Sequence, residues 1–162
     1  MVEPPDVERI RENVAKSALE QGSRALPRPL PVPWAMLGAP YRPTPSFVRS
    51  LGLDLADYKH EVLFRIDLDE RLGVVGLAAV AEGTAAAVPA KASAIFRGAL
   101  IAGAARVALV HNHPSRSKVP SAQDHALTKR IRLCGELLRL PLHDHLIVAG
   151  EGVYSFRVAG GL

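Results

Sequence analysis

Cysteine is almost absent from this chain, which has one, Cys134, among 162 residues. A single cysteine excludes an intramolecular disulfide and any zinc knuckle built from several cysteines. The chain is therefore compatible with a reducing compartment, and we expect a cytoplasmic protein. A chain of this length suits one domain whose core needs neither a disulfide nor a structural metal. Any metal ion that it binds would then have a catalytic role rather than a structural one.

A long hydrophobic run and a secretory signal are also missing. Charged residues interrupt the most apolar region, 76–110, which falls short of the roughly 20 uninterrupted apolar residues that a membrane span needs. The N-terminal sequence MVEPPDVERI is acidic and contains prolines, without the basic start and apolar core of a signal peptide. We therefore expect a soluble protein with no membrane partner.

The balance of charge is basic, with a formal net charge of +4 at pH 7 and a pI of about 9.6. This balance permits contact with nucleic acid or an acidic partner and requires neither. Six basic residues gather in or just after a histidine-containing segment: Arg116, Lys118, Lys129, Arg130, Arg132 and Arg139. Two interpretations stay open, a solvated loop and helix face or a patch that binds phosphate groups.

Two regions are expected along the chain. In residues 1–56, the spacing of apolar residues predicts an amphipathic helix over 6–21. Seven prolines between Pro27 and Pro45 then favour an extended, polyproline-like arm over a helix or a central strand. The compact domain is expected to cover residues 57–162.

Within this domain, hydrophobic periodicity predicts a mixed central β-sheet flanked by helices, an α/β or α+β sandwich. Residues 61–68 alternate as a half-buried strand does, which puts Glu61 at the strand's start on the more polar face. Residues 106–110 resemble a central strand that leads directly into His111. Further strands are expected at 74–80, 145–149 and 153–158, and helices at 91–102 and 121–139.

The most informative segment is HNHPSRSKVPSAQD, from His111 to Asp124. Residues i and i+2 of an extended segment point to the same side, so His111 and His113 can direct two ring nitrogens at one ion. Asp124, in the first turn of the next helix, can supply a third ligand. Three protein ligands and one open position are typical of catalytic zinc.

Each part of this segment also has a plainer explanation. A histidine pair on a strand is often incidental, and Ser121 with Asp124 fits a helix capping box. The joint occurrence favours the zinc site. A second pair, His143 and His145, lacks a following SxxD and is not expected to bind metal. The letters HNH do not predict an HNH nuclease, because that family spreads its named residues over a ββα unit.

The segment resembles the JAMM motif, also called MPN+ or JAB: a distant glutamate, HxHP, seven residues and SxxD. The region from Glu61 to about Arg157 is more closely similar to the RadC branch of that family. Four blocks carry this resemblance in the same order: EVLFRIDLD at 61–69, HNHPS at 111–115, PSAQDHALT at 120–128 and DHLIV at 144–148. The resemblance implies an MPN/JAB-like, cytidine-deaminase-like sandwich.

The resemblance also implies the roles of the site residues. His111, His113 and Asp124 would bind Zn²⁺, Glu61 would be the general base, and Ser121 would hydrogen-bond the attacking water or the oxyanion. Arg116 stands where RadC proteins usually have glycine, and Lys118 stands near a usual second proline. The segment at 92–94 also lacks the family's Pro-Arg-Glu. The loop beside the metal is therefore expected to differ in shape and to be more basic.

Three functions follow from these observations. The leading hypothesis is a zinc-dependent metallopeptidase or isopeptidase that acts on a protein or peptide substrate. The second is a nucleic-acid-associated protein that binds through the basic face near Arg116 and Lys129. The third is a zinc-binding scaffold without catalysis, against which the intact motif argues. The peptide, the type of amide bond, the role of the proline-rich arm and the oligomeric state stay open.

Overall fold

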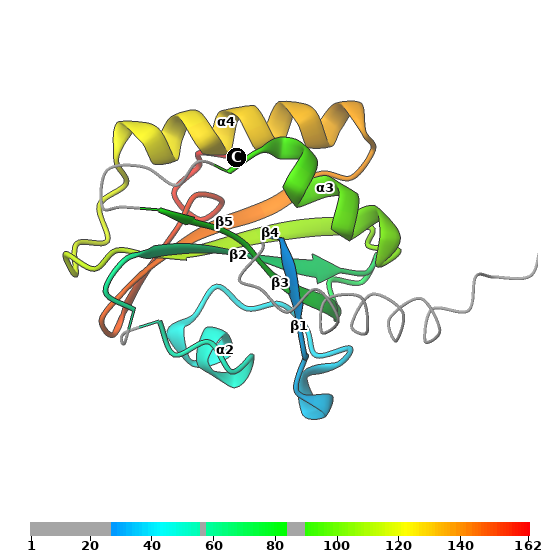
Figure 1. The fold of residues 1–162 in the computed structure, drawn as a ribbon, viewed down its shortest axis with the longest axis horizontal. Helices are drawn as coiled ribbons and strands as arrows, with labels where there is room; N and C mark the ends of the chain where they lie inside the picture. The colour runs from blue at the N-terminus through cyan, green and yellow to red at the C-terminus, as the bar shows by residue number, and fades with distance from the viewer. Residues whose placement is uncertain (1–26, 56–57, 84–89) are drawn as a thin grey trace, which may run out of the picture.

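The computed structural model describes residues 27–55, 58–83 and 90–162, which form a mixed six-stranded sheet with helices on both faces (Figure 1). The strand order is β1-β3-β2-β4-β5-β6, and β4 with β5 is the one parallel pair among the described strands. The strands are β1 (Arg28–Leu30), β2 (Glu61–Leu68), β3 (Val74–Gly83), β4 (Arg106–Asn112), β5 (Leu142–Ala149) and β6 (Gly152–Ser155). The expected mixed α+β fold is confirmed.

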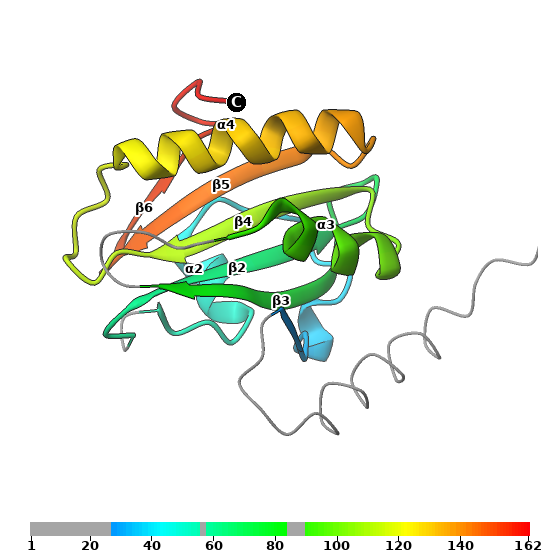
Figure 2. The ribbon, with the colours of Figure 1, turned by 45° about the horizontal axis from the view of Figure 1, so that its top comes forward.

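The helices divide between the two faces of the sheet. Helices α3 (Ala92–Ile101) and α4 (Ala122–Leu137) cover one face, and the short α2 (Pro45–Ser50) covers the other (Figures 1 and 2). A 3₁₀ helix, η1, spans Trp34–Met36. No helix in the described ranges has both the length and the apolar character that crossing a membrane requires.

Two hydrophobic clusters lie on opposite sides of the sheet, and β4 contributes to both. Ala108 and Val110 join the cluster under α2, whereas Val107 and Leu109 join the cluster under α3 and α4. Burial on both faces explains the uninterrupted apolar run of this strand, because neither face meets water. A strand buried in this way fixes the position of His111, near its end, and of His113, directly after it.

The expectation that β2 is half-buried is wrong, since every residue after Glu61 is buried. The two charged residues on its less apolar face neutralise each other: Arg65 Nε lies 2.6 Å from Asp67 Oδ1. Arg65 also donates a hydrogen bond from Nη1 to the carbonyl of Ile95 in α3, at 2.7 Å. Alternating polarity therefore reflects an internal ion pair rather than contact with solvent.

Residues 27–55 contribute to the sheet and to the core beneath it. β1 pairs antiparallel with β3, and the prolines around it keep it short and at the edge. Helix α2 starts at Pro45 and buries Phe47 and Val48 in the cluster on its face. The helix expected at 6–21 lies outside the described residues, and the boundary near residue 57 stays a prediction.

Candidate metal centre

The two histidines and the aspartate of the sequence motif meet where β4 ends and α4 begins. The Nε2 atoms of His111 and His113 lie 3.0 Å apart. Asp124 Oδ1 lies 3.0 Å from His111 Nε2, and Asp124 Oδ2 lies 3.3 Å from His113 Nε2. The side chains of these histidines are 2% and 9% exposed, and that of Asp124 is 10% exposed. Three ligand atoms thus converge in a largely dry site.

The spacing of these atoms fits a tetrahedral metal ion. Ligand atoms bonded at about 2.0 to 2.1 Å to a tetrahedral ion lie about 3.3 Å from one another. The two Nε2 atoms are 3.0 Å apart, and they lie 3.0 and 3.3 Å from the Oδ1 and Oδ2 atoms of Asp124, respectively, which is close to that value. Two imidazole nitrogens and a carboxylate also suit a divalent ion of intermediate softness. His111, His113 and Asp124 can therefore hold one metal ion.

Helix α4 presents Asp124 through a capping box. The Ser121 side chain accepts a hydrogen bond from the Asp124 backbone N–H at 3.1 Å, and Asp124 Oδ2 accepts from the Ser121 N–H at 2.7 Å. Ser121 Oγ also donates to Asp124 Oδ2 at 2.7 Å. The capping explanation and the ligand explanation are thus compatible, because the cap fixes the carboxylate that faces the histidines.

Electrostatics favour the ionised form of Asp124. Burial alone would raise the pKa of its carboxyl, but a hydrogen bond from His111, whose Nε2 proton a bound cation would replace, and the hydrogen bonds from Ser121 hold this pKa well below its usual value. The negative charge at Oδ1 and Oδ2 is therefore available to a cation.

A chain of hydrogen bonds behind His111 fixes its tautomer. Thr128 Oγ1 donates to the Asp124 carbonyl at 2.6 Å, so it accepts from His145 Nδ1 at 2.7 Å. His145 Nε2 must then accept from His111 Nδ1, 2.8 Å away. The proton on Nδ1 leaves the Nε2 lone pair of His111 free for a metal ion.

His145 contacts a candidate ligand, and the sequence did not identify it as part of this site. It is fully buried, and burial lowers its pKa well below the usual value. The ring is therefore neutral, as the hydrogen bonds to Thr128 and His111 require. Its place in the DHLIV block was the one available signal. His125 has a different environment, with its ring edge packed on Phe156 at a centroid distance of 5.2 Å.

Replacing His145 with phenylalanine is expected to weaken zinc binding about 10- to 100-fold, because His111 loses the partner that fixes its tautomer. The His145 ring stacks on Phe156 at 5.1 Å, so a phenyl ring should preserve the packing. Zinc affinity would be measured by competition with a chromophoric chelator. His143→Phe, on the same strand, is the matched control, and equal affinities of both variants would contradict the expected role.

The loop after His113 is tied to the second histidine. His113 Nδ1 donates to the Ser117 carbonyl at 2.7 Å, which frees the Nε2 lone pair on the side of Asp124. The Arg116 N–H donates to the His113 carbonyl, and Arg116 has a φ of 60°, in the left-handed region that favours glycine. The backbone conformation thus favours glycine at this position, which is the residue that the family resemblance leads us to expect there.

Arg116→Gly is expected to raise the free energy of unfolding by about 0.5 to 1 kcal/mol. A non-glycine residue in this region costs roughly 1 to 2 kcal/mol, and the entropy of glycine in the unfolded chain offsets part of the gain. Urea unfolding would measure the change. Arg116→Ala keeps the Cβ atom and is the matched control; an equal gain for alanine would assign the effect to the lost charge.

Strand pairing places Glu61 on the same face of the sheet as the histidines. Leu63 lies directly opposite His111, and Glu61 shares the face of Leu63 because side chains alternate along a strand. Glu61 is half-buried at the start of β2. Within the described residues it forms no hydrogen bond or ion pair with the three candidate ligands, so the structure brings Ser121 into contact with them but not Glu61.

Two of the basic residues of α4 have specific partners. Arg130 donates to the carbonyl of Ala90 at 2.7 Å, and Arg132 pairs with Glu136 at 2.9 Å. Exposed leucines, among them Leu133 and Leu137, lie on the same helix. Basic and apolar side chains thus share this helix, and a phosphate-binding face near Arg116 and Lys129 stays a prediction.

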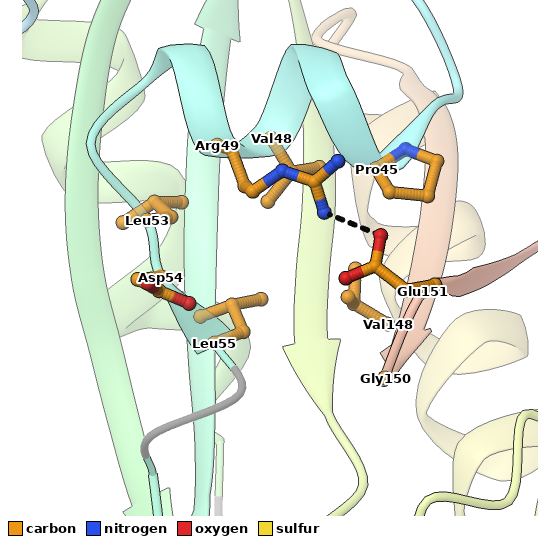
Figure 3. A pocket seen from close by; sticks show the side chains of 9 residues that line it. All are labelled: Pro45, Val48, Arg49, Leu53, Asp54, Leu55, Val148, Gly150 and Glu151. Atoms are coloured by element: carbon orange, nitrogen blue, oxygen red, sulfur yellow. Dashed lines mark hydrogen bonds and ion pairs between the residues drawn. The ribbon is translucent and has the colours of Figure 1, made fainter.

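A hollow of about 310 Å³ lies on the other face of the sheet, between α2 and the β5–β6 turn. Figure 3 shows Arg49 and Glu151 meeting across it, with a separation of 3.1 Å between Nη1 and Oε2. Val148, which belongs to the core cluster under α2, lines the hollow. The hollow contains none of the candidate ligands and is separate from the metal centre.

A mixed six-stranded sheet with a His-His-Asp group between a central strand and the helix above it defines an α+β domain of the JAB/MPN-like class. The sequence model of the RadC-like JAB domain matches residues 44–161. The chain belongs to the RadC-like JAB domain family. This match confirms the resemblance carried by the four sequence blocks.

Curated relatives support the same assignment. A UPF0758 protein of Thermotoga maritima is 38% identical over 104 residues, covering 64% of this chain and 47% of that protein. A UPF0758 protein of Rhodobacter capsulatus is 35% identical over 144 residues, covering 85% and 60%. The chain spans about half the length of the curated relatives it matches, and their names state no activity.

Proposed function

We propose that this protein is a zinc-dependent hydrolase that cleaves an amide bond, as a metallopeptidase or isopeptidase. The observation that carries the proposal is the convergence of two imidazole lone pairs and one ionised carboxylate within 3.3 Å of one another. Three protein ligands leave a fourth position open for a water molecule or a substrate oxygen. The exposed Ser121 lies directly beside this group.

A bound Zn²⁺ would polarise the amide carbonyl and lower the pKa of a coordinated water toward about 7. Glu61 would take the proton from the attacking water and deliver it to the leaving nitrogen, because its face and its position at the strand end direct it toward the same region. Ser121 would donate a hydrogen bond from its hydroxyl to the oxyanion, in place of its hydrogen bond to Asp124, and would keep its proton.

The proposal is tested with the full chain, loaded with zinc and incubated in H₂¹⁸O with synthetic peptides that include lysine isopeptide linkages. We expect cleaved products that carry ¹⁸O in the new carboxyl group, detected by mass spectrometry. A chelator should stop the cleavage, and added zinc should restore it. Cleavage that persists after removal of the metal, or no cleavage of either linkage at full zinc occupancy, would overturn the proposal.

A further inference from the structure

The backbone pairing between strands β2 and β4 ends at the candidate metal centre. Their antiparallel ladder runs from the pair Leu68 and Arg106 to the pair Leu63 and His111, where it ends. From there β4 remains paired with β5, and the His113 N–H donates to the Val148 carbonyl. The first residues of β2 therefore lack the backbone partners on the β4 side that the rest of the strand has.

The side chain of Asn112 replaces these missing partners. Its Oδ1 accepts a hydrogen bond from the Val62 N–H at 2.8 Å, and its Nδ2 donates to the His60 carbonyl at 2.9 Å. The residue is 2% exposed, so both bonds are shielded from water. The two backbone groups that Asn112 holds are those on either side of Glu61.

We infer that Asn112 is a positioning residue that holds Glu61 in place relative to His111 and His113; this inference rests on the proposed function. On its other side Glu61 is paired with Gly83 of β3, so the amide completes its attachment to the sheet. Asparagine suits this position because it combines one acceptor with a donor, whereas aspartate has no donor and leucine has neither.

Asn112, the residue between the two histidines, thus has a role that is separate from metal binding. Side chains alternate along β4, so the neighbours of Asn112 face the candidate metal while Asn112 reaches the adjacent strand. The same short segment thus supplies two metal ligands and the link to the general base. An error of about 1 Å in the position of a catalytic group can lower a rate about 100-fold, so this link bears on catalysis.

Two variants separate the bonds that Asn112 makes. Asn112→Leu removes both, whereas Asn112→Asp keeps the acceptor for the Val62 N–H and loses the donor to His60. Ile66→Val, a conservative change in the buried part of β2, is the control for a general loss of stability. The first measurement is amide hydrogen exchange of the zinc-free protein, which is independent of activity.

We expect the Val62 amide to exchange at least about 10-fold faster in Asn112→Leu than in Asn112→Asp, relative to Phe64 in each protein. The second measurement is hydrolysis of a peptide cleaved by the wild-type protein. Both Asn112 variants should bind one zinc ion, keep KM within about twofold and lose kcat by about 10- to 100-fold. In a Glu61→Gln background the same substitutions should have no further effect.

Three results would overturn the inference. They are unchanged Val62 exchange in Asn112→Leu, full kcat in both zinc-loaded Asn112 variants, and equal losses of kcat with and without Glu61. The last result would show that Asn112 acts on something other than the general base. Failure of the proposed function would look different, because the wild-type protein would then lack hydrolysis while the exchange measurement still reported on the Asn112 contacts.

Discussion

His113→Ala is expected to leave the protein without stoichiometric zinc and without hydrolytic activity. His113 Nε2 lies 3.0 Å from His111 Nε2 and 3.3 Å from Asp124 Oδ2, and the three residues form the candidate metal-binding group. Structural zinc sites bind with about 10 to 16 kcal/mol over four ligands, so one ligand contributes roughly 3 kcal/mol, or about a hundredfold in affinity. Zinc content after dialysis and zinc affinity by chelator competition would measure the loss.

The matched control for this prediction is His143→Ala. That histidine lies on β5 away from the candidate ligands, with its ring edge against Tyr41 at a centroid distance of 5.1 Å. The control should keep one zinc ion per chain and normal activity. A His113→Ala protein that binds zinc with the affinity of the wild type would contradict the assignment of the ligand.

Glu61→Gln should separate binding from catalysis, because it keeps one zinc ion per chain while kcat falls about 100- to 10,000-fold. Glutamine has nearly the shape of glutamate but cannot accept a proton at neutral pH. The loss should therefore appear in kcat, with zinc affinity and KM close to those of the wild type. Zinc content by atomic absorption and steady-state peptide hydrolysis would measure the two effects.

Glu82→Gln is the control for removing a negative charge near the same strand end. Glu82 lies opposite Val62 in the β2–β3 ladder and pairs with His60 at 3.7 Å, so it is an acid close to Glu61 with a different partner. It should retain most of the activity. Full hydrolysis by Glu61→Gln would exclude Glu61 as the general base, and another group would have to take the proton.

The candidate ligands were predictable because all three lie within a segment of 14 residues. In His111 to Asp124, a strand end, a proline-bounded loop and a helix N-terminus have fixed local geometries, so their spacing indicates which side chains meet. The same local logic predicted that β4 is a central strand, since its apolar run has no polar face.

The contacts that span the sheet were not predictable in this way. His145 reaches His111 across 34 positions, and this pairing depends on the parallel register of β4 and β5. Asn112 reaches Val62 across 50 positions because the β2–β4 ladder ends one residue earlier. Such contacts follow from strand order and register, which periodicity does not determine.

The wrong expectation that β2 is half-buried has a related cause. Alternation between apolar and charged residues indicates a strand, but it does not say whether the charges meet water or each other. Arg65 and Asp67 are two apart on one face, close enough to pair beneath α3. The charged pattern that was interpreted as a solvent-facing side therefore belongs to the interior.

The assignment of the metal ligands would be tested by a crystal structure of the zinc-loaded protein with diffraction data on both sides of the zinc absorption edge. We expect one anomalous peak per chain, bonded to His111 Nε2, His113 Nε2 and a carboxylate oxygen of Asp124, with Ser121 and Glu61 near the open side. A protein fully loaded with zinc whose anomalous peak lies elsewhere, or is bound by only one of these residues, would contradict it.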